Sequence, residues 1–300
     1  MSPGQADNRD SGVCRQGGHR GAALPDYYNT VAHDVIECCG SSGGRDWLRR
    51  AGAISLASAP RPSLPDSPAD ARAGEPFVCS WSGGKDSCLA FHRAVRAGKR
   101  PVALLNMLTE GGSRSRSHGL HLSVLQAQAD ALGLPLVTRT ASWDRYEAEF
   151  LDALRGFADR SVRTGVFGDI AGEPNRLWVE SACRRSGMRP LLPLWGGRPP
   201  ELLKGFIDLG FQAVIVVVRD GVLDASLLGR PLDHRLVEEL TAAGIDPSGE
   251  AGEYHTVVTG GPLFARRLPL RAGRRLLRDG CWFLDVSVDD GEATDKKGTP

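Results

Sequence analysis

One stretch of this chain constrains its fold more than any other. Residues 77–87 read Phe-Val-Cys-Ser-Trp-Ser-Gly-Gly-Lys-Asp-Ser, a short apolar run that ends in a Ser-Gly-Gly turn. Apolar residues at helical spacing follow from Cys88 to Val95. The stretch therefore predicts a strand, a tight turn and a helix. The two glycines let the backbone turn sharply and approach a ligand closely.

The turn predicts a site for a polyphosphate. The backbone amides of residues 84–87 are expected to point out of the helix N-terminus, where the helix dipole favours an anion. Lys85 adds a positive charge and Ser87 adds a hydroxyl. The P-loop pattern G-x-x-x-x-G-K-[ST] is not met. A glycine turn followed by an exposed lysine is the alternative interpretation.

The same stretch resembles the PP-loop of the N-type ATP pyrophosphatases, which cleave ATP to AMP and pyrophosphate. GMP synthetase, NAD synthetase, argininosuccinate synthetase and the tRNA-thiolating enzymes share this loop. The loop alone does not choose among them, so the rest of the chain has to decide.

Composition limits the class of protein. The 300 residues allow one large domain or two modest ones, and a net charge of +1 gives no overall electrostatic case for nucleic-acid binding. Seven cysteines form no C-x-x-C pair, which favours free thiols in a reducing cytoplasm over disulfides or a zinc site. No apolar run reaches the roughly 20 residues of a membrane-spanning helix, and no secretory signal is seen. We therefore predict a cytoplasmic protein with no membrane partner.

Four parts of the chain differ in composition. Residues 1–75 are rich in Gly, Ser, Pro, Asp and Arg, which predicts a poorly ordered leader, with a docking tail as the alternative. Residues 76–197 are predicted to form the PP-loop domain. Residues 198–288 form a smaller second domain, and residues 289–300 are polar and predicted to be frayed.

Strand and helix patterns alternate through the first domain. Apolar runs at 77–81, 102–107, 134–139, 166–170 and 190–195 predict strands, and helices are expected between them. This order predicts an α/β fold in which a parallel sheet carries helices on both faces. Ligands of such sheets bind outside the carboxyl ends of the strands. Residues that follow strands are expected to converge there, namely Gly83, Gly84, Lys85, Glu110 and Asp169.

The second domain carries a different pattern. Helices are expected at 200–209 and 233–243, a β-branched strand at 213–218, and closing strands at 268–270 and 282–288. These elements predict a small α+β domain.

Residues 249–264 narrow the resemblance. They include Gly-Glu-Ala-Gly-Glu-Tyr-His-Thr, and the chain also carries Gly168-Asp169-Ile170, Arg176-x-x-x-Glu180, Pro193-Leu194-Trp195 and Leu228-Gly229-Arg230. Together these motifs resemble the diphthine–ammonia ligase family from Phe77 to Phe264. The resemblance implies a HUP-type PP-loop domain followed by a smaller domain. It also implies an ATP-dependent ligase that adenylates a carboxylate and lets ammonia displace AMP, which is an amidation used in diphthamide synthesis.

The resemblance implies roles for the nucleotide-binding residues. The loop residues Ser82, Gly83, Gly84, Asp86 and Ser87 are assigned to phosphate binding. Lys85 is assigned as the positive charge that pairs with the phosphates, and it is a candidate catalytic residue. Asn106 and Met107 are expected to lie against the adenine. Asp86 and Asp169 are candidates for Mg2+, with helix capping as the alternative. His118 is assigned to the nucleotide or the acceptor, or is a loop histidine.

The second domain is expected to supply the acceptor site. Glu250, Glu253 and His255 are candidate catalytic residues, because a carboxylate can hold ammonium and take its proton. Thr256 is a candidate substrate contact. A solvated turn is the alternative for this cluster. Arg176 and Glu180, one helical turn apart, either orient the acceptor or form a surface ion pair.

Several partners and competing functions follow. We expect ATP, Mg2+, ammonium and a carboxylate acceptor, which is either diphthine on elongation factor 2 or a small-molecule carboxylate; a homodimer is one option. A tRNA-thiolating enzyme would be expected to show paired reactive cysteines and a basic face, which are not apparent here. A non-catalytic ATP sensor is the second alternative.

Overall fold

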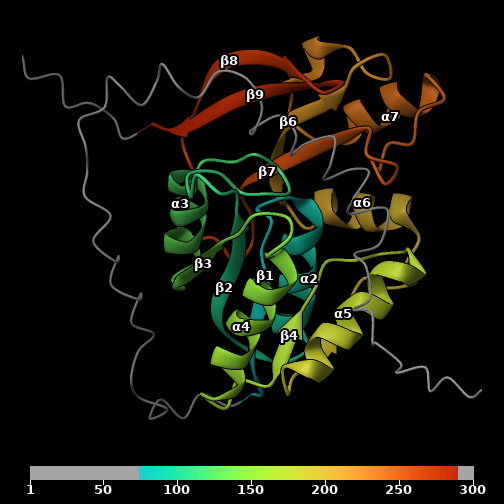
Figure 1. The fold of residues 1–300 in the computed structure, drawn as a ribbon. Helices are drawn as coiled ribbons and strands as arrows, with labels where there is room; N and C mark the ends of the chain where they lie inside the picture. Colours follow the sequence, from blue (N-terminus) through green and yellow to red (C-terminus); the bar gives the residue numbers. More distant parts are fainter. Residues whose placement is uncertain (1–73, 290–300) are drawn as a thin grey trace, which may run out of the picture.

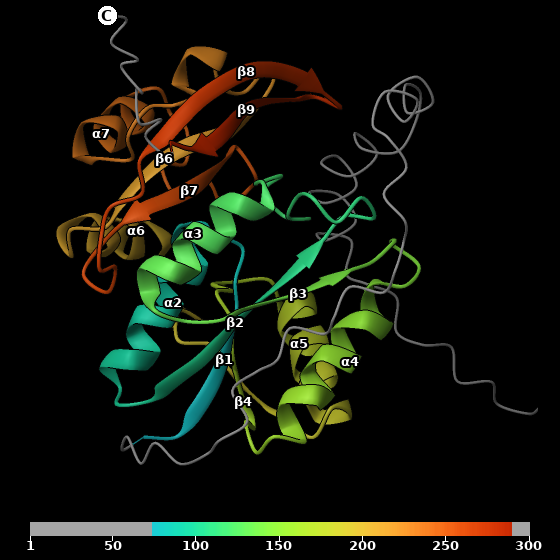
Figure 2. The same ribbon diagram turned by 90° about the vertical axis from the view of Figure 1, so that its left-hand side faces the viewer.

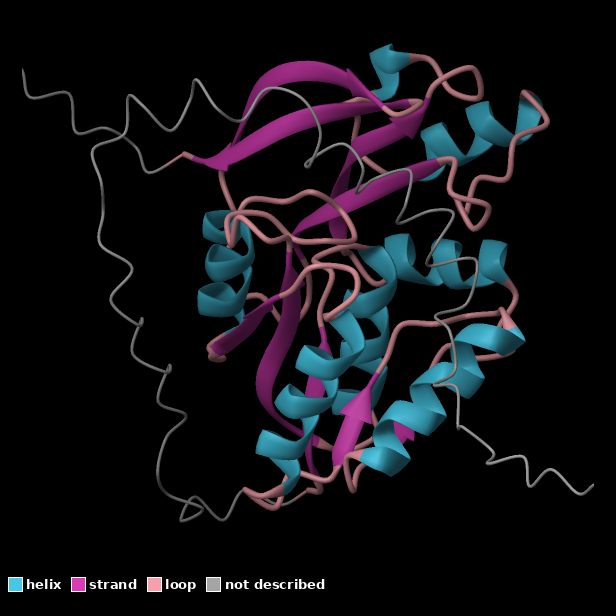
Figure 3. Ribbon diagram, viewed as in Figure 1, coloured by secondary structure: helices cyan, strands magenta, loops and turns pink. Residues whose placement is uncertain are grey.

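The computed structural model describes residues 74–289, in two stacked parts (Figure 1). Residues 1–73 of the predicted leader (1–75) and residues 290–300 of the predicted tail (289–300) lie outside the described residues. An α/β part carries a smaller antiparallel sheet above it, and loops join strands to helices where the two parts meet (Figure 3). Within residues 74–289, no helix is both long and apolar enough to span a bilayer.

The first sheet confirms the predicted parallel architecture. Its strands are β1 (Pro76–Ser80), β2 (Arg100–Leu108), β3 (Leu136–Thr140), β4 (Thr164–Val166) and β5 (Arg189–Leu191). They lie in the order β3-β2-β1-β4-β5, and each neighbouring pair is parallel. The order reverses direction on the two sides of β1, so the turn that follows β1 lies at the switch point where ligands of such sheets bind.

Helices cover both faces of this sheet (Figure 2). The helices α2 (Lys85–Arg96) and α3 (Leu122–Leu132) pack on one face, and α4 (Tyr146–Ala158) and α5 (Glu173–Arg185) pack on the other. Along β1, Phe77 and Cys79 join the first core while Val78 joins the second. This alternation is the period-2 pattern of a strand buried on both sides.

The second sheet is antiparallel, which confirms the predicted α+β domain. The elements of this domain are α6 (Pro199–Asp208), β6 (Gln212–Arg219), the short 3₁₀ helix η2 (Ala225–Leu227), α7 (His234–Ala242), β7 (Tyr254–Gly260), β8 (Leu270–Arg278) and β9 (Cys281–Val288). The strands lie in the order β7-β6-β9-β8. The exact boundary between the domains at 197 and 198 stays a prediction.

Three of the predicted strands differ most from those in the structure. The strand β4 ends at Val166, where its pairing with Cys79 of β1 stops, and β5 ends at Leu191, where its pairing with Val166 of β4 stops. Asp169 therefore lies in a loop beyond the strand. The predicted closing strand at 268–270 is instead β8, which is exposed along its length. Its arginines interrupt the alternation of apolar and polar residues that usually indicates a strand, because an edge strand can carry charged side chains on both faces.

The phosphate loop joins the two parts. The amide of Val258, on the edge strand β7, donates to the carbonyl of Gly83 at 2.9 Å. Gln128 of α3 is fully buried, and its Nε2 donates to the carbonyls of Gly83 at 2.9 Å and Val258 at 2.7 Å. One hydrophobic core also runs through both parts. The second domain is therefore packed against the loop.

Candidate active site

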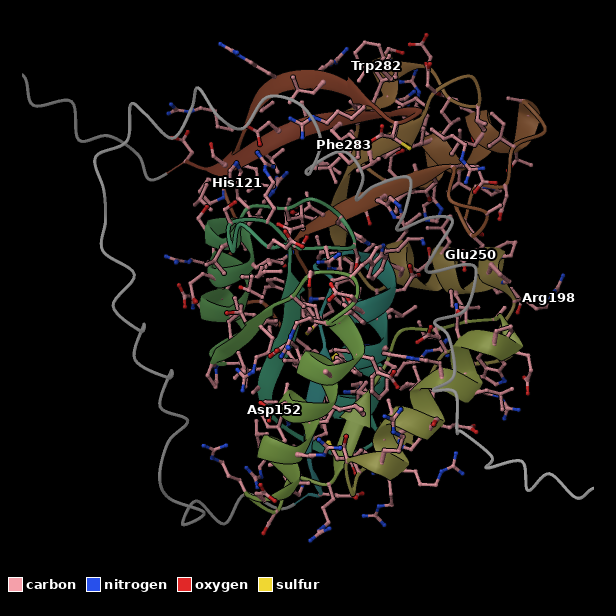
Figure 4. All side chains as sticks on the ribbon, in the orientation of Figure 1. His121, Asp152, Arg198, Glu250, Trp282 and Phe283 are labelled. Carbon is pink, nitrogen blue, oxygen red and sulfur yellow. The ribbon has the colours of Figure 1, made fainter. Side chains whose placement is uncertain are left out.

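A cavity of about 810 Å³ lies at the carboxyl ends of β1, β2 and β4, next to the first residues of β7. Glu250 marks its second-domain side, beneath the antiparallel sheet (Figure 4). The structure brings together most of the residues that the sequence singled out. Those that line the cavity are Ser82, Lys85, Asp86, Ser87, Asn106, Met107, His118, Asp169, Glu250, His255 and Thr256.

Two glycines shape the phosphate loop. Gly83 has a φ of +85°, which L side chains rarely adopt, and a Cβ there would lie 2.8 Å from Oε1 of Gln128. A Cβ on Gly84 would overlap the ring of His118. Both positions therefore require glycine, the first for its backbone angle and the second for the space that the histidine fills.

Two amides that the sequence assigned to the phosphates are already used within the fold. The amide of Gly84 donates to Oγ of Ser82 at 3.3 Å, and the amide of Lys85 donates to Oγ1 of Thr256 at 3.1 Å. The expectation that all four amides of residues 84–87 face an anion is therefore wrong for these two. Asp86 and Ser87 still lie in the first turn of α2, where the helix dipole favours an anion.

Lys85 is the central charge of the cavity. Its Nζ lies 2.8 Å from Oδ2 of Asp86 and 3.3 Å from Oε1 of Glu250, and 5.9 Å from the centre of the Tyr254 ring. Burial by itself lowers the pKa of Lys85, but the charges of Asp86, Tyr254 and Glu250 raise it overall. Burial raises the pKa of Glu250, and Lys85 opposes this shift. The lysine is therefore a permanent cation that an incoming phosphate can share with these carboxylates.

Asp86 and Asp169 fit a magnesium ion shared with phosphates. Both carboxylates line the cavity. The pKa of Asp169 is raised to about 6, mainly by burial and further by the nearby negative charge of Asp86. Residues 74–289 hold no group of three or more potential metal ligands. Magnesium bound to phosphates commonly takes only one or two protein carboxylates. Helix capping does not explain the two side chains, because the N-caps of α2 and α5 are Gly84 and Gly172.

Two histidines meet across the domain boundary. The ring centres of His118 and His255 lie 4.8 Å apart, and Nδ1 of His118 lies 2.9 Å from the carbonyl oxygen of Thr256. Because a carbonyl only accepts, we assign the proton of neutral His118 to Nδ1, which leaves Nε2 as an acceptor. Burial lowers the pKa of His118 to about 4 and also lowers the pKa of His255. Both imidazoles are therefore neutral at pH 7.

His118 should make the fold sensitive to acid. Its pKa is lower in the folded chain than in the unfolded chain, so the unfolded chain binds this proton first as the pH falls. Stability is therefore unaffected at pH 7 and falls between pH 6.5 and about 4. We expect His118→Asn to lose less stability than the native chain over this range. Urea unfolding at a series of pH values tests this, and parallel curves for the two chains would contradict it.

Six predicted residues lie outside the cavity lining, namely the loop glycines Gly83 and Gly84 together with Glu110, Arg176, Glu180 and Glu253. Oε2 of Glu253 accepts from the amide of Ala251 at 3.0 Å, so this carboxylate supports its own turn. Arg176 pairs with Glu173 and, at 3.3 Å, with Glu180 on the surface of α5. This geometry favours the surface ion pair over an acceptor contact. Glu110 is exposed and does not converge with the others, because the loop after β2 carries it away.

Sequence reasoning missed other residues of this wall. Arg116, Trp143, Tyr146, Asn175 and Tyr254 also line the cavity. Trp143 and Tyr146 closely follow the predicted third strand, a position at which ligand contacts could have been expected. Asn175 likewise follows the predicted fourth strand, whereas Arg116 carries no comparable local signal.

The sheet order and the glycine turn before Lys85 define an α/β protein whose parallel sheet carries a loop of the phosphate-binding kind at its switch point. Comparison with family models then extends this class over both parts of the chain. The diphthamide synthase N-terminal domain matches residues 77–190, and the diphthamide synthase C-terminal domain matches residues 198–288. The chain belongs to the diphthamide synthase family.

Curated relatives from human, cattle and zebrafish agree with this assignment, and all three are named diphthine–ammonia ligase. The human protein is 30% identical over 232 residues, which cover 69% of this chain and 86% of the relative. The bovine protein is 30% identical over 213 residues, which cover 62% of this chain and 79% of the relative. The zebrafish (Danio rerio) protein is 29% identical over 232 residues, which cover 68% of this chain and 90% of the relative. The predicted family is thus confirmed.

Proposed function

We propose that this protein is an ATP-dependent amidating ligase that forms a C–N bond, in line with the name diphthine–ammonia ligase that its relatives carry. The observation that carries the proposal is the placement of Lys85. It lies at the start of α2, after the phosphate loop, and pairs with Glu250 of the second domain. A nucleotide bound there would have its phosphates beside residues of both domains.

The first step activates the acceptor. An oxygen of the acceptor carboxylate attacks the α-phosphorus of ATP, the bond to the β-phosphate breaks, and pyrophosphate leaves with the electron pair. Negative charge grows on the phosphate oxygens. Lys85 and the first turn of α2 are fixed in position to stabilise this charge. The hydroxyl of Ser82 donates to Ser87 and that of Ser87 to the carbonyl of Gly84, so each would turn toward the phosphates when a nucleotide binds. Asp86 and Asp169 would hold Mg2+, which supplies further positive charge to the phosphates.

The second step transfers ammonia. Its nitrogen attacks the activated carbonyl carbon, the bond to the AMP oxygen breaks, AMP leaves, and one proton is released from the nitrogen. Glu250 can hold ammonium and take one of its protons before this step, which leaves ammonia as the nucleophile, and a neutral imidazole of His118 or His255 can accept the proton released on attack. Thr256 supports this arrangement, because its hydroxyl and carbonyl hold Lys85 and His118.

The acceptor is proposed from the names of the relatives. Diphthine on elongation factor 2 is the first candidate, and a small-molecule carboxylate is the second. Cytoplasmic location and a homodimer stay predictions. A tRNA-thiolating function receives no support, because the cysteines among residues 74–289 are all buried, and burial raises the pKa values of Cys79, Cys88 and Cys183. Thiols of this kind are poor nucleophiles.

Product identification tests this function. The chain is incubated with Mg2+, ATP and ammonium, and with either a diphthine-bearing elongation factor or a pool of small carboxylates. We expect AMP and pyrophosphate in equal amounts, dependent on one of the acceptors. ADP as the product would contradict the proposal. ATP binding without AMP from either mixture would favour the sensor alternative.

A further inference from the structure

The wall of the cavity formed by the first domain is aromatic. Trp143 follows β3, and Tyr146 is the first residue of α4. Their ring centres lie 5.5 Å apart at 79°, and both rings are only half-buried. The guanidinium of Arg116 lies 4.7 Å from the Trp143 ring and bonds to the carbonyl of Ala141. This contact holds the indole in place, so that the wall offers a fixed aromatic surface.

A buried amide accompanies these rings. Asn175, 5% exposed, lies in the first turn of α5 and lines the same cavity. Its Oδ1 and the indole Nε1 of Trp143 are buried and have no hydrogen-bond partner within residues 74–289. Buried polar atoms without partners are costly, so their presence together in a cavity wall points to a polar ligand.

The cavity is therefore charged near Lys85 and aromatic near Trp143. A nucleoside triphosphate has the same asymmetry, with its phosphates at one end and a planar base at the other. We propose that Trp143, Tyr146 and Asn175 form the nucleobase subsite of this cavity, and that Asn175 selects adenine over guanine. This inference rests on the proposed use of ATP, and it moves the base contact outward from Asn106 and Met107.

Asn106 and Met107 have little bonding capacity left for the base. Nδ2 of Asn106 already donates to the carbonyl of Trp81 at 2.6 Å, and the carbonyl of Met107 accepts from the amide of Arg116 at 2.9 Å. Oδ1 of Asn106 has no partner within residues 74–289, so it remains a second acceptor in the floor of the subsite. Both residues are buried and belong to β2. They form the floor beneath the base, and the rings of Trp143 and Tyr146 supply its stacking surface.

The selection follows from hydrogen-bond chemistry. An asparagine amide can bind adenine through its N6 amino group and N7 acceptor together. Guanine presents the acceptors O6 and N7 on that edge, so Oδ1 of Asn175 would face another acceptor. The amide would then keep only one of its two bonds. A site built around such a bond rejects analogues that cannot form it.

Equilibrium binding to the full chain tests the stacking surface. Dissociation constants are measured for ATP, GTP and inorganic tripolyphosphate, which has no base. Stacking on an aromatic side chain contributes about 1–3 kcal/mol per base, so we expect Trp143→Ala to weaken ATP binding about 5- to 150-fold. Tripolyphosphate binding should change less than about twofold, since this probe makes no base contact. Trp282→Ala is the matched control, because Trp282 lies on β9 outside the cavity lining (Figure 4).

Asn175→Leu tests selectivity. The ratio of the GTP and ATP dissociation constants should exceed about 10 in the native chain and fall to about 1 in the variant, since one lost hydrogen bond of this kind is worth about tenfold or more. Thermal unfolding checks that the variant folds. If neither variant changes ATP affinity or this ratio, the inference is overturned while the proposed function stands. If the native chain binds neither ATP nor tripolyphosphate, both are overturned.

Discussion

Lys85→Ala should reduce the rate of AMP and pyrophosphate formation by at least about 100-fold. Removing one fixed donor that stabilises transition-state charge typically costs about 100- to 1,000-fold in rate. Lys85 carries a full charge, and its Nζ is held between Asp86 and Glu250. Its loss also leaves these two carboxylates facing the phosphates, which adds repulsion. Release of pyrophosphate in the presence of acceptor and ammonium measures the effect.

Lys99→Ala is the matched control for this substitution. Lys99 lies away from the cavity lining, where its Nζ pairs with Glu75 at 2.6 Å. Its removal should leave the rate within about twofold of the native rate, because surface ion pairs contribute little. Comparable turnover in the Lys85 and Lys99 variants would show that the loop lysine does not serve the chemistry. Thermal unfolding of both variants excludes a folding defect as the cause.

The parts of the fold that could be predicted from sequence are those with local or periodic signals. The phosphate loop could be predicted because its glycines, charge and hydroxyl are adjacent in the chain. The parallel sheet could be predicted because strands buried on both faces give short continuous apolar runs. β8 was misjudged because its exposed arginines follow no such pattern.

The rest of the site depends on the order of the strands. Arg116, Trp143 and Asn175 lie in separate segments that follow β2, β3 and β4, and only the order β3-β2-β1-β4 brings those segments to one cavity. Arg176 and Glu180 illustrate the opposite error. Their spacing predicted a pair, which the structure contains, but the surface of α5 that they occupy lies outside the cavity lining.

Gln128 is the residue whose importance the sequence concealed most. It lies in the middle of α3, and its apolar neighbours gave it no special signal. Its Oε1 accepts from the indole Nε1 of Trp81 at 2.9 Å, and its Nε2 donates to Gly83 and Val258. One amide thus joins β1, the phosphate loop and β7. Because the site includes residues from both domains, its geometry depends on this side chain.

We therefore expect Gln128→Leu to lower the free energy of unfolding by about 3 kcal/mol or more. Leucine has a similar size, so the main loss is three hydrogen bonds of about 1 kcal/mol each, with an added cost for buried groups left unsatisfied. Gln126→Leu is the control on the same helix, because Gln126 is exposed and bonds only to the exposed Asp130 among residues 74–289. Such a surface change should stay within about 0.5 kcal/mol.

Denaturant unfolding and ATP binding together test the role of Gln128. The Gln128 variant should unfold at a lower denaturant concentration. Its remaining folded fraction should bind ATP more weakly, because the carbonyl of Gly83 then keeps only the bond from the amide of Val258. Equal midpoints for the Gln126 and Gln128 variants would contradict the structural part of this prediction. A destabilised variant with native ATP affinity would mean that Gln128 supports the fold without positioning the phosphate loop, and that the contacts of Val258 and Thr256 are sufficient for that task.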